Sequence, residues 1–384
     1  MTPLLTKNAS VRATLLFAAT VLATNGCAPE PGTTPESALH TSVLEPTDQG
    51  NLEQRVSEVL SLSNFERTLS TEVNAAWQIM HAVICYGHDL EIKTLDRGQV
   101  GALDYIFSGG MMRGMELRLS VNPLKSTGRV GVKAKFDPGS YIGQGHVDQW
   151  LAICAMADIP MNTQIQIGGF TATLEDWARQ TQFDVSNNPI NEFSWTLIAL
   201  THYFPKEPSW ISEGDIEVTW GMLVEEELRY ELSDSACGGT HRMAGIVAAL
   251  RAAEKLGIAK GPVWKKARER VDGLLTSTRE NRAADGRLSS FYFTRAGNSR
   301  DLFAELSGTG HVFEFVALAS SQEELESEWV ERSAAHLCGL IENMHQQKVD
   351  CGALYHALNG LRVYHKRRWQ SAGASTIRPA KTDP

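Results

Sequence analysis

His146-Val-Asp-Gln-Trp150-Leu-Ala-Ile153 is one copy of a frame that occurs six times along this chain, with a polar residue leading into an apolar run. The other copies are Asn191-Glu-Phe-Ser-Trp195, His241-Arg-Met-Ala-Gly245, His311-Val-Phe-Glu-Phe315, His356-Ala-Leu-Asn-Gly360 and a weaker one around His81. Successive polar positions are separated by 65, 45, 50, 70 and 45 residues. A repeat of about 40 to 50 residues is typical of one helix pair per unit. The frame therefore predicts six related helices.

The apolar runs of the repeat alternate with amphipathic segments. The runs contain few charges in their middles and cover 146–157, 191–203, 241–256, 311–320 and 356–364. Between them, the spacing of apolar residues predicts amphipathic helices at 215–231, with Asp215 as N-cap, and also at 261–276 and 322–346. Apolar helices inside and amphipathic helices outside make an all-α fold, an (α/α)6 toroid of six antiparallel helix pairs.

Two segments depart from the helical pattern. Residues 115–121 and 129–136 alternate apolar and polar residues around a turn, which predicts a small β-hairpin inserted near 115–136. Residues 284–298 form a loop rich in glycine, serine and aromatic residues ahead of the fifth apolar run. This loop accounts for the longest step between copies, and loops of this kind often carry functional residues.

Residues 1–27 have the pattern of a lipoprotein signal peptide. Lys7 and Arg12 supply positive charge, and the apolar segment 13–24 is too short to cross a bilayer. Cys27 directly follows a glycine, which resembles the lipobox of bacterial lipoproteins, in which the cysteine is lipidated. We therefore expect Cys27 to anchor the protein to a membrane, on the extracytoplasmic, periplasmic face of the cell envelope.

The composition divides the remainder into three parts. Residues 28–50 are rich in Pro, Thr, Ser and Glu and predict a disordered tether. Residues 51–366 are long enough for a single toroid domain, and 367–384 are expected to form a disordered tail. The net charge of −9, with no basic stripe, argues against nucleic acid as a partner.

The shared polar position of the repeat is the candidate functional site. In a ring of antiparallel pairs the inner helices run in one direction, so their first turns converge on one rim. We expect that rim to carry His146, Asn191, His241, His311 and His356. Free backbone N–H groups and the helix dipole favour anions at such ends. The structural alternative is that each histidine only caps a neighbouring turn.

Proton transfer is the first chemistry that suits this rim. Neutral histidines are good bases near neutral pH, and a tyrosine can act as the acid. We assign His241 or His311 as base and Tyr355 as acid, with Asn191 and Arg242 neutralising a carboxylate. Residues of these types resemble the set used by helical-toroid polysaccharide lyases, which remove a proton beside a uronate carboxylate.

Metal binding is the second chemistry. Cys237 and His241 come from one repeat, and Cys351 and His356 from another. Zinc accepts cysteine and histidine in tetrahedral geometry, and three protein ligands leave one position open for catalysis. A disulfide between Cys237 and Cys351 is the rival interpretation.

Paired-carboxylate hydrolysis is the third chemistry. Asp148, Glu192 and Glu314 lie one to three residues beyond the shared position. Glycosidases need two acids about 5 to 9.5 Å apart, and the sequence does not fix that distance.

The repeat, the helix alternation and the loop Asp285-Gly286-Arg-Leu-Ser289-Ser290-Phe291 resemble the α/α-toroid group of terpenoid cyclases and protein prenyltransferases. Members of that group carry a Gln-x-x-Asp-Gly-Ser/Gly-Phe motif ahead of inner helices, and Asn281 or Arg282 stands here in place of the glutamine. Lanthionine-synthetase-like toroids are similar in shape. The acid motif of the cyclases is absent, and the zinc pattern of the prenyltransferases does not transfer residue by residue. The resemblance implies the fold over about 70–366 and not the reaction.

These observations together predict a lipid-anchored envelope protein with a histidine-lined pocket. Its expected activity is that of a polysaccharide lyase or hydrolase on an extracytoplasmic glycan, by histidine and tyrosine acid–base chemistry. The alternatives are a zinc-dependent toroid enzyme and a non-catalytic binding or scaffold lipoprotein.

Overall fold

The computed structural model describes residues 49–124, 126–137, 146–188 and 192–370. Six of its helices coincide with the six copies of the repeat. They are α2 (Ala76–Tyr86), α4 (Gln149–Met156), α6 (Ser194–Tyr203), α8 (Thr240–Lys255), α10 (Leu302–Ala319) and α13 (Cys351–His365).

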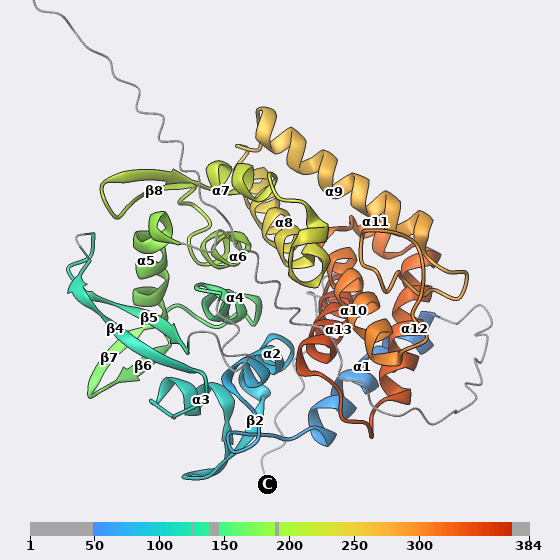
Figure 1. The fold of residues 1–384 in the computed structure, drawn as a ribbon, viewed down its shortest axis with the longest axis horizontal. Coiled ribbons are helices and arrows are strands. Elements are labelled where there is room, and N and C mark those ends of the chain that lie inside the picture. The colour runs from blue at the N-terminus through green and yellow to red at the C-terminus, as the bar shows by residue number, and fades with distance from the viewer. Residues whose placement is uncertain (1–48, 125, 138–145, 189–191, 371–384) are drawn as a thin grey trace, which may run out of the picture. The chain divides into compact units, whose positions relative to one another are not determined.

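These six helices, which we call the inner helices, pack against one another in a closed circuit. Each contacts the next in chain order, and α13 returns to contact α2. Figure 1 shows the six around a common centre. Because α2 and α13 lie far apart in the sequence, the circuit closes only when the two ends of the folded region meet.

A second set of helices lies outside the circuit. It consists of α1 (Gln49–Glu66), α3 (Ala102–Phe107), α5 (Leu174–Asp184), α7 (Trp220–Glu227), α9 (Pro262–Asn281), α11 (Gln322–Leu325) and α12 (Glu328–Asn343). Amphipathic helices bury one face against a neighbour, and α9, for example, contacts both α8 and α10. Trp150 and Trp195 of the inner set and Trp177 and Trp220 of the outer set are fully buried, so the core lies between the two sets.

Short turns complete the helical structure. They are η1 (Gly87–Asp89), η2 (Val185–Asn187), η3 (Leu232–Asp234), η4 (Ala236–Gly239) and a π-helical turn, η5 (Lys366–Gln370). The tail expected at 367–384 is therefore wrong in its first residues, which are helical. Residues 371–384 lie outside the described part, as do residues 1–48, which include the expected signal peptide and Cys27.

The expected all-α class is wrong, because about 57% of the structure is helix and 14% is strand. One sheet holds β1 (Leu69–Ser70), β2 (Glu91–Thr94) and β3 (Gly98–Gly101). Three antiparallel pairs follow: β4 (Met115–Pro123) with β5 (Val130–Phe136), β6 (Gln164–Ile167) with β7 (Phe170–Thr173), and β8 (Ser209–Ser212) with β9 (Ile216–Thr219). The pair β4–β5 occupies the segment for which the sequence predicts a hairpin.

The other hairpins share one position in the architecture. The pairs β2–β3, β6–β7 and β8–β9 each follow an inner helix and lead directly into an outer one. After β7, the Thr173 hydroxyl accepts a hydrogen bond from the Asp176 N–H and caps α5. A strand pair thus replaces the plain loop that an all-helical repeat would contain.

The helix expected at 215–231 is wrong in its first part. Residues 216–219 form β9, Asp215 lies in the turn with a φ of 59°, and α7 begins only at Trp220. The side chains alternate with the period of a strand: Trp210 and Val218 are buried, while Ile211 is exposed. The helix expected at 322–346 is likewise interrupted, between α11 and α12.

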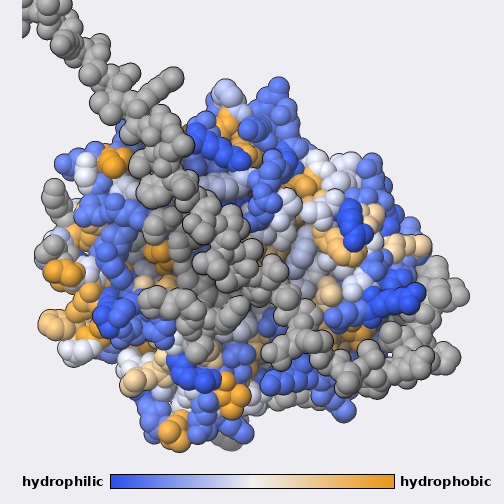
Figure 2. Space-filling view, in the orientation of Figure 1, coloured by the Kyte–Doolittle hydropathy of each residue, from blue (hydrophilic) through white to orange (hydrophobic). Residues whose placement is uncertain are grey.

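Several apolar side chains of the hairpins face solvent. Val121, Phe170 and Ile211 are 95%, 66% and 60% exposed. Figure 2 shows hydrophobic residues on the side where Figure 1 labels β4 to β8, among mostly hydrophilic surroundings. Within the described ranges, no helix combines the length and the apolar character needed to cross a bilayer.

The close packing of α6 against α8 depends on Gly245. A Cβ at this position would lie 2.4 Å from Ser194 Cα and 2.7 Å from the Ser194 carbonyl oxygen. Both atoms belong to the backbone, so no side-chain rotation relieves the overlap. Alanine here would force the two inner helices apart.

Gly245→Ala is therefore expected to lower the free energy of unfolding by about 1 to 3 kcal/mol, the range for overpacked cores. The matched control is Gly273→Ala in α9, where a Cβ would meet nothing within 4 Å. That change is expected to raise the free energy of unfolding by up to about 1 kcal/mol, because alanine is the better helix former. Urea unfolding measures both, and a stabilising Gly245→Ala would contradict the packing argument.

Candidate functional site

Four histidine rings from four inner helices meet inside the circuit. The ring centroid of His356 lies 5.2 Å from that of His81, 4.9 Å from that of His241 and 4.3 Å from that of His311. The His241 and His311 centroids are 5.6 Å apart. We call these four residues the histidine cluster. The sequence repeat thus brings together side chains that are up to 275 positions apart in the chain.

His146 reaches the cluster through a tryptophan. The centroid of the Trp195 ring lies 4.8 Å from that of His241 and 6.0 Å from that of His146. His146 Nδ1 lies 3.2 Å from Glu192 Oε2. Asn191, the sixth polar residue of the repeat, lies outside the described residues.

The sequence predicts that the repeat histidines all lie in the first turn of their helices, but in the structure they do not. His241 is the second residue of α8, but His81, His311 and His356 lie well inside α2, α10 and α13. Backbone N–H groups inside a helix are already bonded to carbonyls four residues earlier. The expected anion site of converging helix starts is therefore wrong, and the side chains have to carry the chemistry.

Glu314 determines which nitrogen of His356 carries the proton. Glu314 Oε2 lies 2.7 Å from His356 Nδ1, and the Asn359 amide donates to the other carboxylate oxygen. A carboxylate only accepts, so His356 donates from Nδ1, and in its neutral form it has a lone pair at Nε2. His241 Nε2 lies 3.3 Å from His356 Nε2, and with His356 in that form His241 is the donor of the pair. His241 is then left with a lone pair on Nδ1.

The backbone fixes His311 in the same way. His311 Nδ1 lies 2.7 Å from the Ser307 carbonyl oxygen, which can only accept, so the lone pair of His311 is on Nε2. His241 Nδ1 and His311 Nε2 are both buried and have no hydrogen-bond partner in the described part of the chain. Buried polar atoms are nearly always satisfied. Two such lone pairs on neighbouring rings are available to bind a common ligand.

Both imidazoles are held in the neutral form. Burial lowers the pKa of His241 and of His311 well below its ordinary value, and the neighbouring His356 lowers both further. Burial likewise lowers the pKa of His81 to about 3. Neutral imidazole is the form that binds a metal ion.

Cys237 lies one helical turn before His241, in a strained turn. Its φ of 50° is in the left-handed region, which a residue with a side chain rarely adopts. Gly238 follows with a φ of 61°, and a Cβ there would lie 2.4 Å from the Tyr292 side chain. Strain of this kind persists only where surrounding structure enforces it, and it clusters at functional sites.

The thiol completes a group of three metal-binding side chains. Ligand atoms of Cys237, His241 and His311 all lie within 4.8 Å of one another. Tetrahedral zinc, with bonds of about 2.0 to 2.3 Å, holds its ligand atoms a little under 4 Å apart. The group therefore needs a contraction of only about 1 Å to enclose an ion of that size.

The structure brings together two of the four metal ligands predicted from sequence. Cys237 and His241 belong to the group, but Cys351 and His356 do not, and His311 takes their place. His356 instead occupies the second layer, between Glu314 and His241. The rival disulfide is absent, because neither Cys237 nor Cys351 is disulfide-bonded.

The expected carboxylate-neutralising residue is already engaged. Arg242 donates to Glu227 Oε2 at 2.9 Å and to the Ser235 hydroxyl at 2.7 Å, and it stacks over the Tyr230 ring. Burial raises the pKa of Glu227 to about 7, although Arg242 pulls it down. Arg242 thus belongs to a buried structural pair.

Tyr355, the expected acid, is also placed away from the cluster. Its ring packs edge-on against Tyr86, with centroids 6.3 Å apart, and it is buried. Burial raises its pKa, which makes it a weaker acid. The structure therefore gives Tyr355 a packing role.

The three carboxylates considered for glycoside hydrolysis have different partners. Glu192 faces His146 and Glu314 faces His356. Asp148, buried at the start of α4, accepts hydrogen bonds from the hydroxyls of Thr181 and Thr196. Each of the three therefore has a hydrogen-bonding or ion-pair partner of its own.

Asp148 gives the fold a pH dependence that can be measured. Burial raises its pKa from 3.8 to about 6, against the opposing effect of the two threonine hydroxyls. A carboxyl whose pKa is higher in the folded state stabilises the fold, and this contribution to the free energy of unfolding is complete below about pH 4. That contribution is lost as the pH rises through 6, and it amounts to at most about 3 kcal/mol.

Asp148→Asn is expected to remove the loss of stability that accompanies ionisation of Asp148 as the pH rises. The free energy of unfolding of the unchanged protein should fall relative to that of the variant between pH 4 and pH 7. Urea unfolding at several pH values measures the difference, in which the titration of other groups cancels. Parallel pH profiles of the two proteins would show that Asp148 is not responsible.

Comparisons of the chain with family models, curated proteins and solved structures gave no match. The case for function therefore rests on the geometry of the site.

The sequence analysis missed the roles of two groups at this site. Glu314 and Asn359 each lie three residues after a repeat histidine, His311 and His356. On a helix that spacing places the two residues on one face. The sequence therefore already indicated an acid and an amide beside the histidines. The bond from Ser307 to His311 involves a backbone carbonyl and leaves no trace in the sequence.

Proposed function

We propose that this protein is a metal-dependent enzyme, a hydrolase or lyase, whose zinc ion is bound by Cys237, His241 and His311. One observation carries the proposal: a thiol and two imidazole rings, each ring with a buried unpartnered nitrogen, converge within 4.8 Å. Cysteine and histidine are the preferred ligands of zinc, and their number here leaves one tetrahedral position for water or substrate.

The second layer supports a catalytic centre. Glu314 and His356 hold His241 in the tautomer with its lone pair on Nδ1, as carboxylate–histidine pairs do behind metal ligands. In such a centre zinc lowers the pKa of a bound water to about 7. The buried surroundings strengthen each charge interaction at the ion.

His146 is the acid–base group that we assign to proton transfer. It is bound to Glu192, contacts the Trp195 ring that adjoins His241, and has a side chain that is 22% exposed. Cys237 is also partly exposed, while His311 is buried. Substrate is therefore expected to approach from the side of His146 and Cys237.

An extracytoplasmic glycan is the substrate class that we propose, in a protein attached to a membrane through Cys27. The support is the signal-like segment 1–27, with its apolar stretch and the cysteine after glycine. An enzyme anchored at the extracytoplasmic face has access to the glycans of the cell envelope.

Metal analysis of the purified protein tests the centre directly. After dialysis against metal-free buffer, we expect about one equivalent of zinc per chain, and markedly less in Cys237→Ser. Cobalt exchanged into the protein should give a thiolate charge-transfer absorption that the same variant lacks. Cys351→Ser is the matched control, because Cys351 is a buried cysteine outside the group.

Two results would count against the proposal. The first is a protein that retains no zinc even after incubation with an equimolar amount. The second is zinc loss in Cys351→Ser but not in Cys237→Ser. A metal-free protein with no activity on glycans would instead favour the binding or scaffold alternative.

A further inference from the structure

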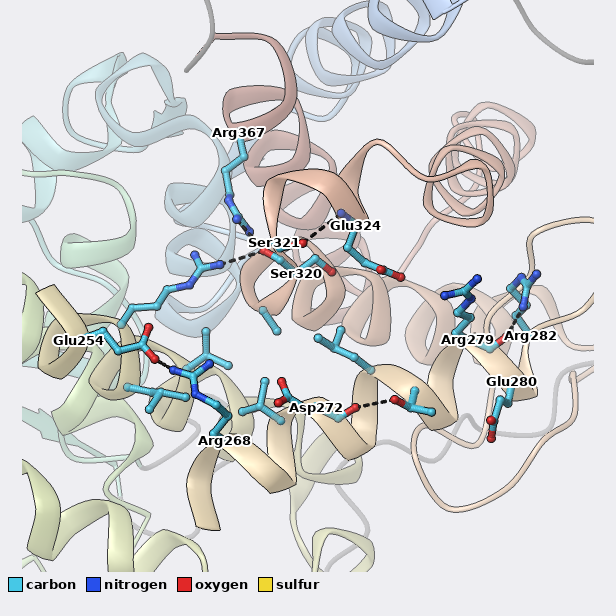
Figure 3. A pocket seen from close by; sticks show the side chains of 17 residues that line it. Glu254, Arg268, Asp272, Arg279, Glu280, Arg282, Ser320, Ser321, Glu324 and Arg367 are labelled. Atoms are coloured by element: carbon cyan, nitrogen blue, oxygen red, sulfur yellow. Dashed lines mark hydrogen bonds and ion pairs between the residues drawn. The ribbon is translucent and has the colours of Figure 1, made fainter. Parts of the chain in front are cut away.

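A second candidate site lies between α8, α9 and the end of α10, apart from the histidine cluster. It is a cavity of about 670 Å³, shown in Figure 3, within the range of small-molecule pockets. One wall is apolar and consists of Val247, Leu250, Val271 and Leu275. None of the proposed metal ligands borders this cavity.

Two guanidinium groups line the cavity beside Ser320. Arg251 Nη2 donates to the Ser320 carbonyl oxygen at 3.1 Å, and Arg367 Nη2 donates to the same atom at 2.7 Å. Figure 3 shows Arg367 pointing toward Ser320. Over the described ranges, neither arginine forms an ion pair, whereas Arg268 at the rim is paired with Glu254.

The charge of the two arginines is only partly compensated by the protein. Backbone carbonyls at the end of α10 accept hydrogen bonds from both guanidinium groups. Among the described contacts, Arg251 donates only one such hydrogen bond. Each guanidinium has five N–H donors. Burial lowers the pKa of Arg251, and burial together with Arg251 lowers that of Arg367 to about 10. Four carboxylates line the same cavity, those of Glu254, Asp272, Glu280 and Glu324, but none forms an ion pair with Arg251 or Arg367 in the described structure. Two adjacent, half-buried cations without an ion-pair partner favour an anion beside them.

A buried hydroxyl adds a second, independent indication. Ser320 is fully buried and lines the cavity, and its Oγ has no hydrogen-bond partner in the described structure. The two guanidinium groups converge on the backbone carbonyl oxygen of the same residue. A ligand carboxylate beside Ser320 would accept from the hydroxyl and from the remaining N–H groups of the two arginines.

We propose that this cavity binds a small organic acid, with its carboxylate between Arg251 and Arg367 and its hydrocarbon part against the apolar wall. The inference is independent of the proposed zinc centre, since the two sites share no residue. It assigns the cavity a ligand that combines one negative charge with a short apolar chain.

Calorimetric titration of the whole protein with four probes tests this assignment. Octanoate is expected to bind at one site and octan-1-ol at least about tenfold more weakly, because the alcohol lacks the charge-assisted hydrogen bonds. Acetate should also bind far more weakly, since each buried methylene adds about fourfold to affinity. Inorganic phosphate should bind no better than acetate.

Some outcomes of the titration would overturn the proposal. Equal binding of octanoate and octan-1-ol would mean that the arginines do not recognise charge. Phosphate or acetate as tight as octanoate would mean that the site selects the ion alone. No binding of octanoate at millimolar concentration would also reject the proposal.

Three variants locate the binding. Arg251→Gln is expected to weaken octanoate about tenfold or more, and Leu275→Trp to block it by filling the cavity. Arg270→Gln, on the exposed face of α9 and outside the cavity, should change nothing. If Arg251→Gln fails to fold, Leu275→Trp decides, because undiminished octanoate affinity in that variant overturns the proposal. The zinc content should be the same in all the folded variants, which separates this test from that of the metal centre.

Discussion

Alanine in place of His311 is expected to leave the protein unable to retain zinc through dialysis. Structural zinc sites bind with roughly 10 to 16 kcal/mol over four ligands, so one ligand accounts for about 3 to 4 kcal/mol. Zinc affinity should therefore fall by several hundredfold. Competition with a chromophoric chelator measures the affinity, and the same variant should lose any zinc-dependent activity.

His345→Ala is the matched control for this experiment. Its Nδ1 bonds to the Glu342 backbone carbonyl at 2.7 Å, as that of His311 does to Ser307, but it lies outside the metal-binding group. Zinc affinity should be unchanged in this control. If His311→Ala keeps the affinity of the unchanged protein, His311 is not a ligand.

Removal of the carboxylate behind the cluster is the second change with a large expected effect. Glu314→Ala leaves the buried His356 Nδ1–H and the Asn359 amide without their acceptor. Each buried donor left without an acceptor costs about 1 to 3 kcal/mol, so the two together cost roughly 2 to 6 kcal/mol. The free energy of unfolding of the metal-free protein should fall by that amount, as measured by urea unfolding.

Glu314→Gln separates stability from metal binding. Glutamine keeps the shape and one accepting oxygen, so the loss of stability should be smaller than in the alanine variant. It no longer supplies a charged acceptor for His356, and zinc affinity should fall by about 10- to 100-fold, as for other second-layer changes. Zinc affinity equal to that of the unchanged protein would show that Glu314 does not orient His241.

The periodic features of the fold were predictable from sequence, and the short ones were not. The six apolar runs predicted six helices because each run is long enough for its period to be distinct. The hairpins β2–β3, β6–β7 and β8–β9 escaped prediction because their strands have four residues each, too few to separate a period of 2 from one of 3.6. The pair Gly168-Gly169 is typical of a two-residue hairpin turn, and both residues adopt positive φ in the turn of β6–β7.

The candidate site was predictable in its members more than in its geometry. The repeat identified His241, His311 and His356 as neighbours, since equal positions on packed helices come together. It placed them in a first turn because the start of each apolar run was taken as the start of a helix. α10 begins at Leu302, nine residues before His311 and ahead of the apolar run at 311–320. Sequence spacing could not show whether His311 or His356 would face Cys237.

The circuit of inner helices has a consequence for the order of events during synthesis. Cys237 and His241 leave the ribosome long before His311, and His356, which orients His241, emerges near the end of the folded region. On the proposed ligand set, an unfinished or truncated chain lacks a competent coordination sphere. Only a chain that includes His311 and His356 would then bind the metal in the proposed way.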